Sequence, residues 1–325
     1  MNIAIIKLTA MGDIIQSAFV VQFIKKAFAD ANIDWFLEEA FFEVLEHNPQ
    51  INLKPLNLKS IKKSKLKIFH EIKKIKKYAT KKYDFIIDMQ ALLKSAIVAK
   101  LLGKNTFGYD KNSAREKIAA FFYQHSFDIP YHLATSDRYR LLINKTLDMN
   151  ITKEDILKKE PFLFYLDSHE KKIQKYLKKE KKNIVFIIGA SWESKIYPKG
   201  LVQEVIDNLD ANFIIPHSNK KEEEFVDSLK NVTKVKLNLN ELKALISNAD
   251  LVIGNDTGPT YMAWANNIPS IVLFGPVPPN RIYPDKKTIL LKSPSKVDPY
   301  KLNKNDFSIK KIPPSKIIKA AKELL

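Results

Sequence analysis

Short apolar segments that each lead into a turn and then a helix dominate this chain of 325 residues. Residues 2–7 form one such segment, apolar positions at helical spacing follow over 13–29, and residues 33–37 form a second strand. A strand, a helix and a strand in that order predict a parallel sheet with a right-handed crossover. A second series of the same kind begins at residues 183–188. The pattern therefore predicts an α/β protein with two facing Rossmann-like domains and a cleft between them.

A polar, proline-terminated stretch over 152–161 separates the two series. We predict a first domain over 1–155 and a second over 156–312, each long enough for a core of its own. Residues 313–325 begin with two prolines and continue as an amphipathic helix. We expect this last helix to pack back toward the first domain.

The composition narrows the possible partners and compartments. The chain has no cysteine, which excludes disulfides and thiolate metal sites and fits a reducing cytoplasm. It contains no apolar run of the roughly 18 residues that a membrane span needs, and its N-terminus resembles a first strand rather than a signal peptide. We therefore expect a soluble protein. Its 54 Lys and Arg against 36 Asp and Glu give a net charge of +18, which attracts nucleic acid, anionic lipid or phosphorylated sugars.

Lysine is concentrated between residues 54 and 82, where twelve lysines accompany a single acid, Glu71. Apolar residues keep helical spacing within this stretch, so it is interpreted as an amphipathic basic helix. A solvated face over a core stripe explains most of these lysines. The functional alternative is a landing surface for an anionic substrate or a membrane.

Three stretches of small polar residues follow predicted strands, at 9–13, 189–195 and 254–260. Ligands bind at the carboxyl ends of the strands in sheets of this kind. In the third stretch, Pro259 suits the first turn of a helix, whose free N–H groups would favour a phosphate. An ordinary capped turn explains these residues equally well.

Two charged side chains in these stretches have both a structural and a chemical interpretation. Lys195 is suited to a leaving phosphate, although a surface lysine is common in so basic a chain. Asp13 begins a helix, so it is either a capping carboxylate or a general base for a sugar hydroxyl.

Several familiar motifs are absent. The chain has neither the glycine-rich dinucleotide fingerprint nor a P-loop, and no G-x-S-x-G nucleophile turn. It has no D-x-D carboxylate pair of the kind that holds a divalent metal in many nucleotide-sugar transferases. Its six histidines are scattered, which disfavours a metal site.

Taken in series, the motifs resemble those of the bacterial ADP-heptose:lipopolysaccharide heptosyltransferases over nearly the whole chain. The first domain contributes KLTAMGDI at 7–14, EE at 38–39, DMQALLKS at 88–95 and SARE at 113–116. The second contributes the Lys195 loop, EEE at 222–224, DTG at 256–258 and FGP at 274–276. Within the family, the MGD and SARE motifs favour the members that act on Kdo (type I) over those that act on the first heptose (type II).

The resemblance implies a GT-B fold with the acceptor in the first domain and ADP-heptose in the second. It implies an inverting, metal-independent transfer of L-glycero-D-manno-heptose to Kdo of lipid A–Kdo in the lipopolysaccharide inner core. No cofactor is expected; the donor substrate is ADP-L-glycero-β-D-manno-heptose. Asp13 would be the catalytic base. The implied donor-binding residues are Ser191, Lys195, Glu222, Asp256, Thr257, Gly258 and Tyr261, and the implied acceptor-binding residues are Lys94, Arg115, Lys62 and Lys63.

A lipid A acceptor implies a cytoplasmic protein that is peripheral on the inner face of the inner membrane. The remote alternative is a non-enzymatic binder of anionic membrane or nucleic acid, but the aromatics of the lysine-rich stretch lie on its apolar stripe. One departure from the family is Tyr261, where relatives usually have histidine. Tyrosine can donate a hydrogen bond to a phosphate but cannot carry the charge of an imidazolium.

Overall fold

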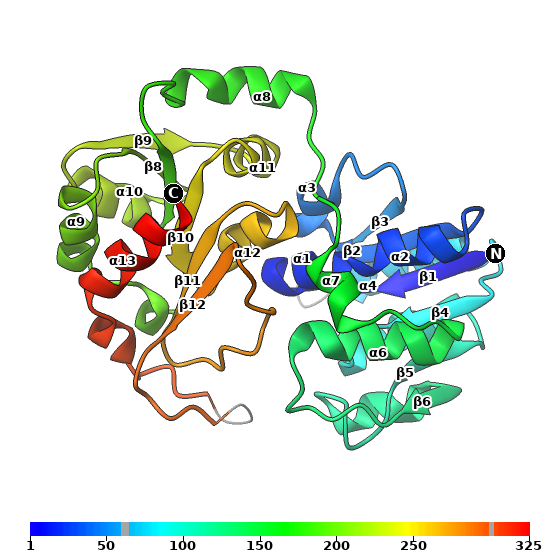
Figure 1. Ribbon diagram of the computed structural model, residues 1–325. Coiled ribbons are helices and arrows are strands. Elements are labelled where there is room, and N and C mark those ends of the chain that lie inside the picture. The colour runs from blue at the N-terminus through cyan, green and yellow to red at the C-terminus, as the bar shows by residue number, and fades with distance from the viewer. Residues whose placement is uncertain (60–64, 299–301) are drawn as a thin grey trace. The chain divides into compact units, whose positions relative to one another are not determined.

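The computed structural model describes residues 1–59, 65–298 and 302–325, and the chain divides into two compact units, Met1–Phe162 and Leu163–Leu325 (Figure 1). Each unit is built around its own parallel sheet. The boundary falls a few residues after the 155/156 position expected from the sequence. Among the described residues, no helix is both long enough and apolar enough to cross a membrane.

In the described residues of the first unit, six parallel strands lie in the order β3-β2-β1-β4-β5-β6. The strands are β1 (Asn2–Ile6), β2 (Asn32–Glu38), β3 (Asn52–Leu56), β4 (Phe85–Asp88), β5 (Thr106–Tyr109) and β6 (His125–Phe127). The central strand β1 is buried on both faces, as helices on both sides of a parallel sheet require.

Helices cover both faces of this sheet. One face carries α1 (Met11–Ala18), α2 (Val20–Ala27) and α6 (Thr135–Leu147), which contact one another, with the short α3 (Phe42–Leu45) against α1. The other carries α4 (Lys65–Ala79), α5 (Leu93–Leu102) and the 3₁₀ helix η3 (Lys117–Phe122). The unit ends with α7 (Lys153–Leu157), which begins at a Thr152–Asp155 capping box.

Two helical predictions for this unit need correction. The helix expected over 13–29 is divided at Phe19 into α1 and α2 and ends at Ala27, although Phe19 itself keeps right-handed helical dihedrals. The stretch 54–82 is not a single helix: residues 52–56 form β3, and only Lys65–Ala79 is helical. β3 lies at the edge of the sheet, where Pro55 is tolerated because one side of the strand donates no ladder hydrogen bonds.

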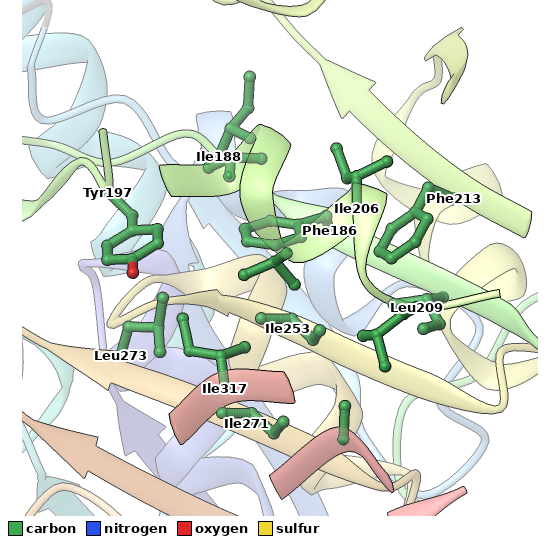
Figure 2. Close-up of a cluster of buried hydrophobic side chains, with 14 of the residues drawn as sticks. Phe186, Ile188, Tyr197, Ile206, Leu209, Phe213, Ile253, Ile271, Leu273 and Ile317 are labelled. Atoms are coloured by element: carbon green, nitrogen blue, oxygen red, sulfur yellow. The ribbon is translucent and has the colours of Figure 1, made fainter. Parts of the chain in front are cut away.

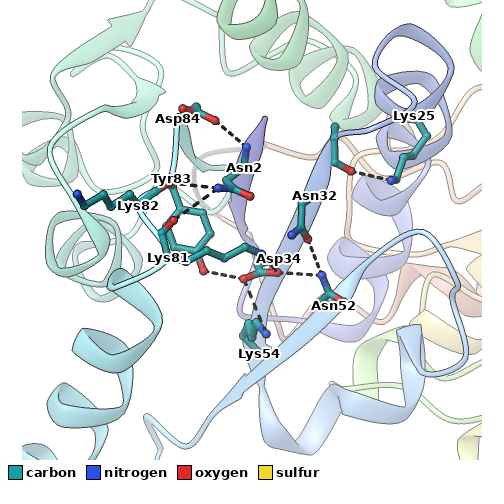
Figure 3. A network of polar contacts seen from close by, with 11 residues as sticks. Asn2, Lys25, Asn32, Asp34, Asn52, Lys54, Lys81, Lys82, Tyr83 and Asp84 are labelled. Atoms are coloured by element: carbon teal, nitrogen blue, oxygen red, sulfur yellow. Dashed lines mark hydrogen bonds and ion pairs between the residues drawn. The ribbon is translucent and has the colours of Figure 1, made fainter.

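A buried carboxylate joins β2, β3 and the segment that precedes β4 (Figure 3). Asp34 of β2 is fully buried and accepts hydrogen bonds from Tyr83 Oη (2.7 Å), Lys81 Nζ (2.8 Å) and Asn52 Nδ2 (3.1 Å). Lys54 Nζ lies 3.8 Å away. Two lysines of the basic stretch are thus used to neutralise one buried acid.

In the described residues of the second unit, six parallel strands repeat the same order of connection, β12-β11-β10-β7-β8-β9. The strands are β7 (Asn183–Ile187), β8 (Asn212–His217), β9 (Val232–Lys236), β10 (Leu251–Asn255), β11 (Ser270–Phe274) and β12 (Thr288–Lys292). The segment expected to begin this series at residues 183–188 is β7.

The helices of this unit also lie on two faces. On one face, α11 (Leu239–Ser247) contacts both α8 (Asp167–Ile173) and α12 (Gly258–Ala265), and it begins at an Asn238–Glu241 capping box. α9 (Lys199–Asp207), α10 (Lys220–Asp227) and α13 (Pro314–Leu324) cover the other face. α8 is followed by a 3₁₀ turn (Gln174–Tyr176) and an irregular segment.

The core beneath α9 and α13 joins side chains that are far apart in the sequence (Figure 2). Phe186 and Ile253 of the central strands and Ile317 of α13 are buried in one cluster. The main contacts of α13 are with α9, β11 and β12. Its apolar face is thus used in the core of the second unit.

Candidate functional site

Both sheets have a topological switch point, where neighbouring strands are followed by connections that run in opposite directions. In the first unit this point lies between β1 and β4, and in the second between β7 and β10. The loops that follow such strands open a crevice at the carboxyl edge of the sheet, where α/β proteins bind ligands. Predicted site residues follow β1, β7 and β10, so we describe each edge in turn.

Asp13 lies in the first turn of α1, directly after the loop that leaves β1, and its side chain is partly buried. Gln90, from the loop after β4, braces this loop with two hydrogen bonds. Its Oε1 accepts from the Thr9 backbone N–H and its Nε2 donates to Thr9 Oγ1, both at 3.0 Å. The two loops of the switch point are therefore joined four residues before Asp13.

A buried carboxylate lies beneath Gln90. Asp88 Oδ1 accepts the Gln90 N–H at 2.8 Å, and Asp88 Oδ2 accepts the hydroxyl of Tyr123 at 2.7 Å. Burial raises the pKa of Asp88 against the opposing effect of these hydrogen bonds. The loop that carries Gln90 is thus held from below by a side chain that has no exposure to solvent.

Lys7, at the end of β1, is a buried cation beside Asp13. It is 4 % exposed, its Nζ donates to the Met89 carbonyl at 3.4 Å, and it lies 5.0 Å from the centre of the Tyr139 ring. Burial lowers the pKa of Lys7, although the charge of Asp13 counteracts this effect. Lys7 was not among the predicted site residues, although it is the first residue of the KLTAMGDI motif and the one charged residue at the end of an otherwise apolar strand.

Two predicted acceptor residues lie on neighbouring elements. Lys94 is in the first turn of α5, with Nζ 3.7 Å from Glu38 Oε1 at the end of β2. Arg115 is exposed in the turn before η3. Glu116 ties that turn to the start of α5, because its Oε2 accepts the Leu93 N–H at 2.7 Å. The other two predicted acceptor residues, Lys62 and Lys63, lie outside the described residues.

In the second unit, a buried ion pair joins the two loops of the switch point. Lys195 Nζ lies 2.6 Å from Asp256 Oδ2, and the two side chains are 10 % and 5 % exposed. Tyr261, one turn into α12, donates its hydroxyl to Asp256 Oδ1. Both oxygens of this carboxylate are thus engaged. The tyrosine that departs from the family pattern is buried and bonded to the aspartate.

The charge of Asp256 is set by its surroundings. Burial opposes ionisation, but the charges of Lys195 and Arg281 and the hydrogen bond from Tyr261 outweigh it and hold the pKa of Asp256 below its ordinary value. Asp256 is therefore an anion at neutral pH. Arg281 was not among the predicted residues, since it lies in an irregular segment after β11 that has no recognisable motif.

Asn255 at the end of β10 holds the two loops in register. Its Nδ2 donates to the Ile188 carbonyl at 2.9 Å, and its Oδ1 accepts the Tyr197 N–H at 3.3 Å. The Lys195 loop therefore leaves β7 and returns beside β10. Ser191, at the start of this loop, is exposed. The ring of Trp192 has two ammonium groups near it, with Lys195 Nζ at 5.5 Å and Lys304 Nζ at 5.1 Å from its centre.

The helix α12 begins where the sequence predicted, with Thr257 as its N-cap residue and Gly258 and Pro259 in its first turn. The Thr257 side chain makes no capping hydrogen bond, so the first N–H groups of α12 are available to an anion. Gly254 allows this turn to form, because a Cβ there would lie 2.7 Å from the Ile187 side chain.

Glu222 approaches the same edge from α10. Its Oε2 accepts the backbone N–H and the hydroxyl of Ser218, at 2.7 and 2.8 Å. Its Oε1 faces the residue that follows β7 so closely that a Cβ on Gly189 would lie 2.5 Å from it. Glu222 thus lies beside the residue that begins the Lys195 loop.

The carboxyl edge of the second sheet therefore joins an ammonium group, a helix N-terminus and an acid that could accept hydrogen bonds from hydroxyls. Such a set is suited to a diphosphate with a sugar on each side. Among the described residues, no group of three or more His, Cys, Asp or Glu side chains could hold a metal ion.

The profile of Glycosyltransferase family 9 (heptosyltransferase) matches residues 72–305. Lipopolysaccharide heptosyltransferase 1 of Campylobacter coli is 37 % identical over all of this chain and 99 % of its own length. The structure of the E. coli heptosyltransferase WaaC with ADP superposes with a TM-score of 0.80 at 21 % identity, over the full length of both chains. WaaC with ADP-2-deoxy-2-fluoro heptose gives 0.78, also at 21 % and over both full lengths. The predicted GT-B fold is confirmed.

Proposed function

Because the chain belongs to glycosyltransferase family 9, the heptosyltransferase family, we propose that it transfers L-glycero-D-manno-heptose from ADP-heptose to Kdo of lipid A–Kdo. The observation that carries this proposal is the 37 % identity, over the whole chain, to a relative named lipopolysaccharide heptosyltransferase 1. The protein is a glycosyltransferase. Our proposal specifies the sugar that it transfers, the acceptor of that sugar, and the bonds that form and break.

The second unit supplies the proposed donor site. WaaC, which shares its fold, has been solved with ADP and with an ADP-heptose analogue. We assign the diphosphate to Lys195 and to the N-terminus of α12 at Thr257 and Gly258, where positive charge and free N–H groups coincide. Glu222 accepts hydrogen bonds from the ribose. Ser191, Asp256 and Tyr261 complete the site, the last two by holding Lys195 and the start of α12 in place.

The chemistry requires one base and one stabilised leaving group. Asp13 takes the proton of the attacking Kdo hydroxyl, whose oxygen bonds to the anomeric carbon of heptose from the side opposite the leaving group. The bond between that carbon and the β-phosphate oxygen breaks, so the configuration inverts and ADP leaves with the electron pair. General base catalysis of this kind contributes typically ~10²–10⁴-fold.

The transfer needs no metal if protein groups neutralise the leaving diphosphate. Lys195 and the helix N-terminus supply positive charge at that place, as a divalent cation does in other glycosyltransferases. We therefore expect a chelator to leave the rate unchanged. A loss of activity that added magnesium restores would contradict this part of the proposal.

The proposed acceptor site lies in the first unit, with Lys94 and Arg115 binding the carboxylates and phosphates of Kdo–lipid A. Lys62 and Lys63 belong to the same expectation. A lipid acceptor implies that the protein acts at the inner face of the inner membrane as a peripheral protein of the cytoplasm.

The decisive experiment is incubation of the protein with ADP-heptose and Kdo₂-lipid A, followed by mass spectrometry of the lipid. We expect one added heptose. Transfer only to an acceptor that already carries heptose would assign the type II reaction instead, and transfer to neither would overturn the proposal.

The base is tested by Asp13→Asn, which keeps the size of the side chain. We expect ADP-heptose affinity close to that of the wild type in calorimetry, with turnover reduced by ~10²-fold or more. Asp30→Asn, an exposed residue of the same unit, is the matched control. Turnover near that of the wild type in the Asp13 variant would remove Asp13 from this role.

A further inference from the structure

The helices α4, α5 and η3 form one layer on the same face of the first sheet. α5 contacts α4 on one side and η3 on the other. Ile75 of α4 and Val98, Ala99 and Leu102 of α5 point inward, into one core with the sheet. Ala119 of η3 packs in a small cluster with α5. The side of this layer that faces away from the sheet is exposed to solvent, and we call it the α4–α5–η3 surface.

Large apolar side chains on this surface point into solvent. Phe121 is 81 % exposed, Ile118 52 % and Ile97 41 %. Phe69 was expected on the apolar stripe of the basic helix, but it is 71 % exposed. Across the described residues, nine large apolar side chains are exposed, and these four include the two most exposed of all. Exposed aromatic and aliphatic side chains gathered on one surface typically mark a place where a partner binds.

The same surface is strongly basic. Its three elements contain six lysines in α4, two in α5 and one in η3. The only acid among them is Glu71, which is 5 % exposed and accepts the Asn57 N–H at 3.1 Å, so it does not offset the charge outside. The three elements that carry the exposed apolar side chains thus also carry exposed lysines, among them Lys67, Lys73, Lys76, Lys77, Lys100 and Lys117.

We propose that the α4–α5–η3 surface binds an anionic lipid bilayer, with Phe121, Phe69 and Ile118 entering the interface and the lysines contacting lipid phosphates. Apolar side chains among lysines have the chemistry of an interfacial membrane site, where burial and attraction to anionic head groups act together. A second copy of this chain is a poor occupant, because its own surface repels one of equal charge. This inference rests on the proposed function for its biological setting, since lipid A lies in such a bilayer.

The proposed acceptor residues belong to the same layer. Lys94 is in the first turn of α5, and Arg115 lies two residues before η3, in a turn that Glu116 ties to α5. Binding of the bilayer by this layer thus holds the phosphorylated head of lipid A near Lys94 and Arg115 while its acyl chains stay in the membrane. The acceptor does not have to leave the bilayer.

The test is flotation of the full chain with vesicles that contain no lipid A and no ADP-heptose. We expect binding to vesicles of phosphatidylcholine and phosphatidylglycerol, weak binding to phosphatidylcholine alone, and loss of binding at high salt. The Phe121→Ser/Ile118→Ser variant should bind the anionic vesicles about tenfold more weakly. All of the altered side chains are exposed, and circular dichroism checks that the variant is folded.

The matched control is Leu166→Ser/Phe307→Ser, which removes two exposed apolar side chains of the second unit, 49 % and 46 % exposed. It should bind vesicles as the wild type does. Equal loss in both variants, or no loss in the Phe121→Ser/Ile118→Ser variant, would overturn the proposal. A single-stranded oligonucleotide provides a further check. If it displaces the anionic vesicles from the wild type and binds the Phe121→Ser/Ile118→Ser variant more weakly, the surface is a nucleic-acid site and the proposal is overturned.

A transfer assay with a water-soluble Kdo acceptor separates this inference from the proposed function. The Phe121→Ser/Ile118→Ser variant should match the wild type on the soluble acceptor and be slower on Kdo₂-lipid A in vesicles. Wild-type protein that transfers to neither acceptor refutes the proposed function, while the vesicle-binding result still decides the membrane surface. Equal rates on the lipid acceptor in both proteins would contradict the inference alone.

Discussion

At the scale of single residues, the proposed donor site depends on the ion pair between Lys195 and Asp256. An ammonium group held 2.6 Å from a buried carboxylate is rigid and in place before a diphosphate arrives. The pair also neutralises the aspartate, which would otherwise be a buried uncompensated charge. The hydroxyl of Tyr261 also stabilises the charge of Asp256, because it donates a hydrogen bond to Oδ1.

Loss of Lys195 should therefore cost stability as well as donor affinity. We expect Lys195→Met to lower the free energy of unfolding by about 3–5 kcal/mol at pH 7, because Asp256 is left buried without its cation. Urea denaturation measures this change, and Lys199→Met on the surface of α9 is the control. A Lys195→Met/Asp256→Asn variant should be more stable than Lys195→Met, and a further loss would contradict this account.

The same pair predicts a pH dependence. The pKa of Asp256 is held below its ordinary value of 3.8 in the folded protein, so its contribution is present above that pH and is lost as the pH falls through the folded pKa. The stability difference between wild type and Lys195→Met should therefore shrink on the acid side of pH 3.8. A difference that stays constant there would show that the charge of Asp256 is not its cause.

Gln90 is the corresponding positioning residue in the first unit. Its two hydrogen bonds to Thr9 brace the loop that ends in Asp13. We expect Gln90→Leu to lower kcat about tenfold or more while the KM for ADP-heptose is unchanged, since a small displacement of a base is costly and the donor binds elsewhere. Exposed Gln124→Leu is the control. A change in KM without a change in kcat would refute the positioning role.

At the scale of elements, Asp34 explains part of the lysine excess. Lys54 lies on β3 and Lys81 follows α4, and both are directed at this one buried carboxylate of β2 (Figure 3). They are therefore structural cations, unlike the exposed lysines of α4. The lysine-rich stretch thus contains both structural lysines and exposed lysines. Only the order of the strands in the sheet shows which lysines reach Asp34.

Neutralising Asp34 should weaken the connection between β2, β3 and the segment that precedes β4. We expect Asp34→Asn to reduce the free energy of unfolding by about 3 kcal/mol, because two partly buried ammonium groups lose a charged acceptor. Chemical denaturation provides the measurement. Asp30→Asn, on the surface of the same unit, should change stability little; an equal effect of both substitutions would argue against the network.

At the scale of the whole molecule, two units with separate cores share one topology. Each has its own buried sheet, and in each unit proposed site residues follow the strands of the switch point. Under our proposal, the first unit binds the acceptor and the second unit binds the donor. Because each unit has its own core, a ligand that binds one unit should stabilise that unit more than the other.

ADP is the ligand with which to test this independence. We expect two unfolding transitions, and ADP at a hundred times its Kd should stabilise one of them by about 2.7 kcal/mol. Scanning calorimetry with and without ADP measures the shift, which Lys195→Met should abolish. An equal shift of both transitions, or a shift retained in that variant, would contradict the assignment of the donor to the second unit.

The sequence by itself determined the α/β class, most strands and the positions of the turns after β1, β7 and β10. Those features follow from apolar periodicity and turn chemistry, which act between residues a few positions apart. It also sufficed, through motifs in series, to select the family. The strand β3 and the break at Phe19 were missed because local patterns resembled a continuous helix.

Only the tertiary structure decided which side chains meet. Lys195 and Asp256 are 61 residues apart, and Thr9 and Gln90 are 81 apart. Their pairing depends on which strands are neighbours in each sheet, and no local pattern specifies that order. The same holds for Tyr261, which the sequence showed as a departure and the fold shows as a donor to Asp256, and for the apolar face of α13, which the second core uses.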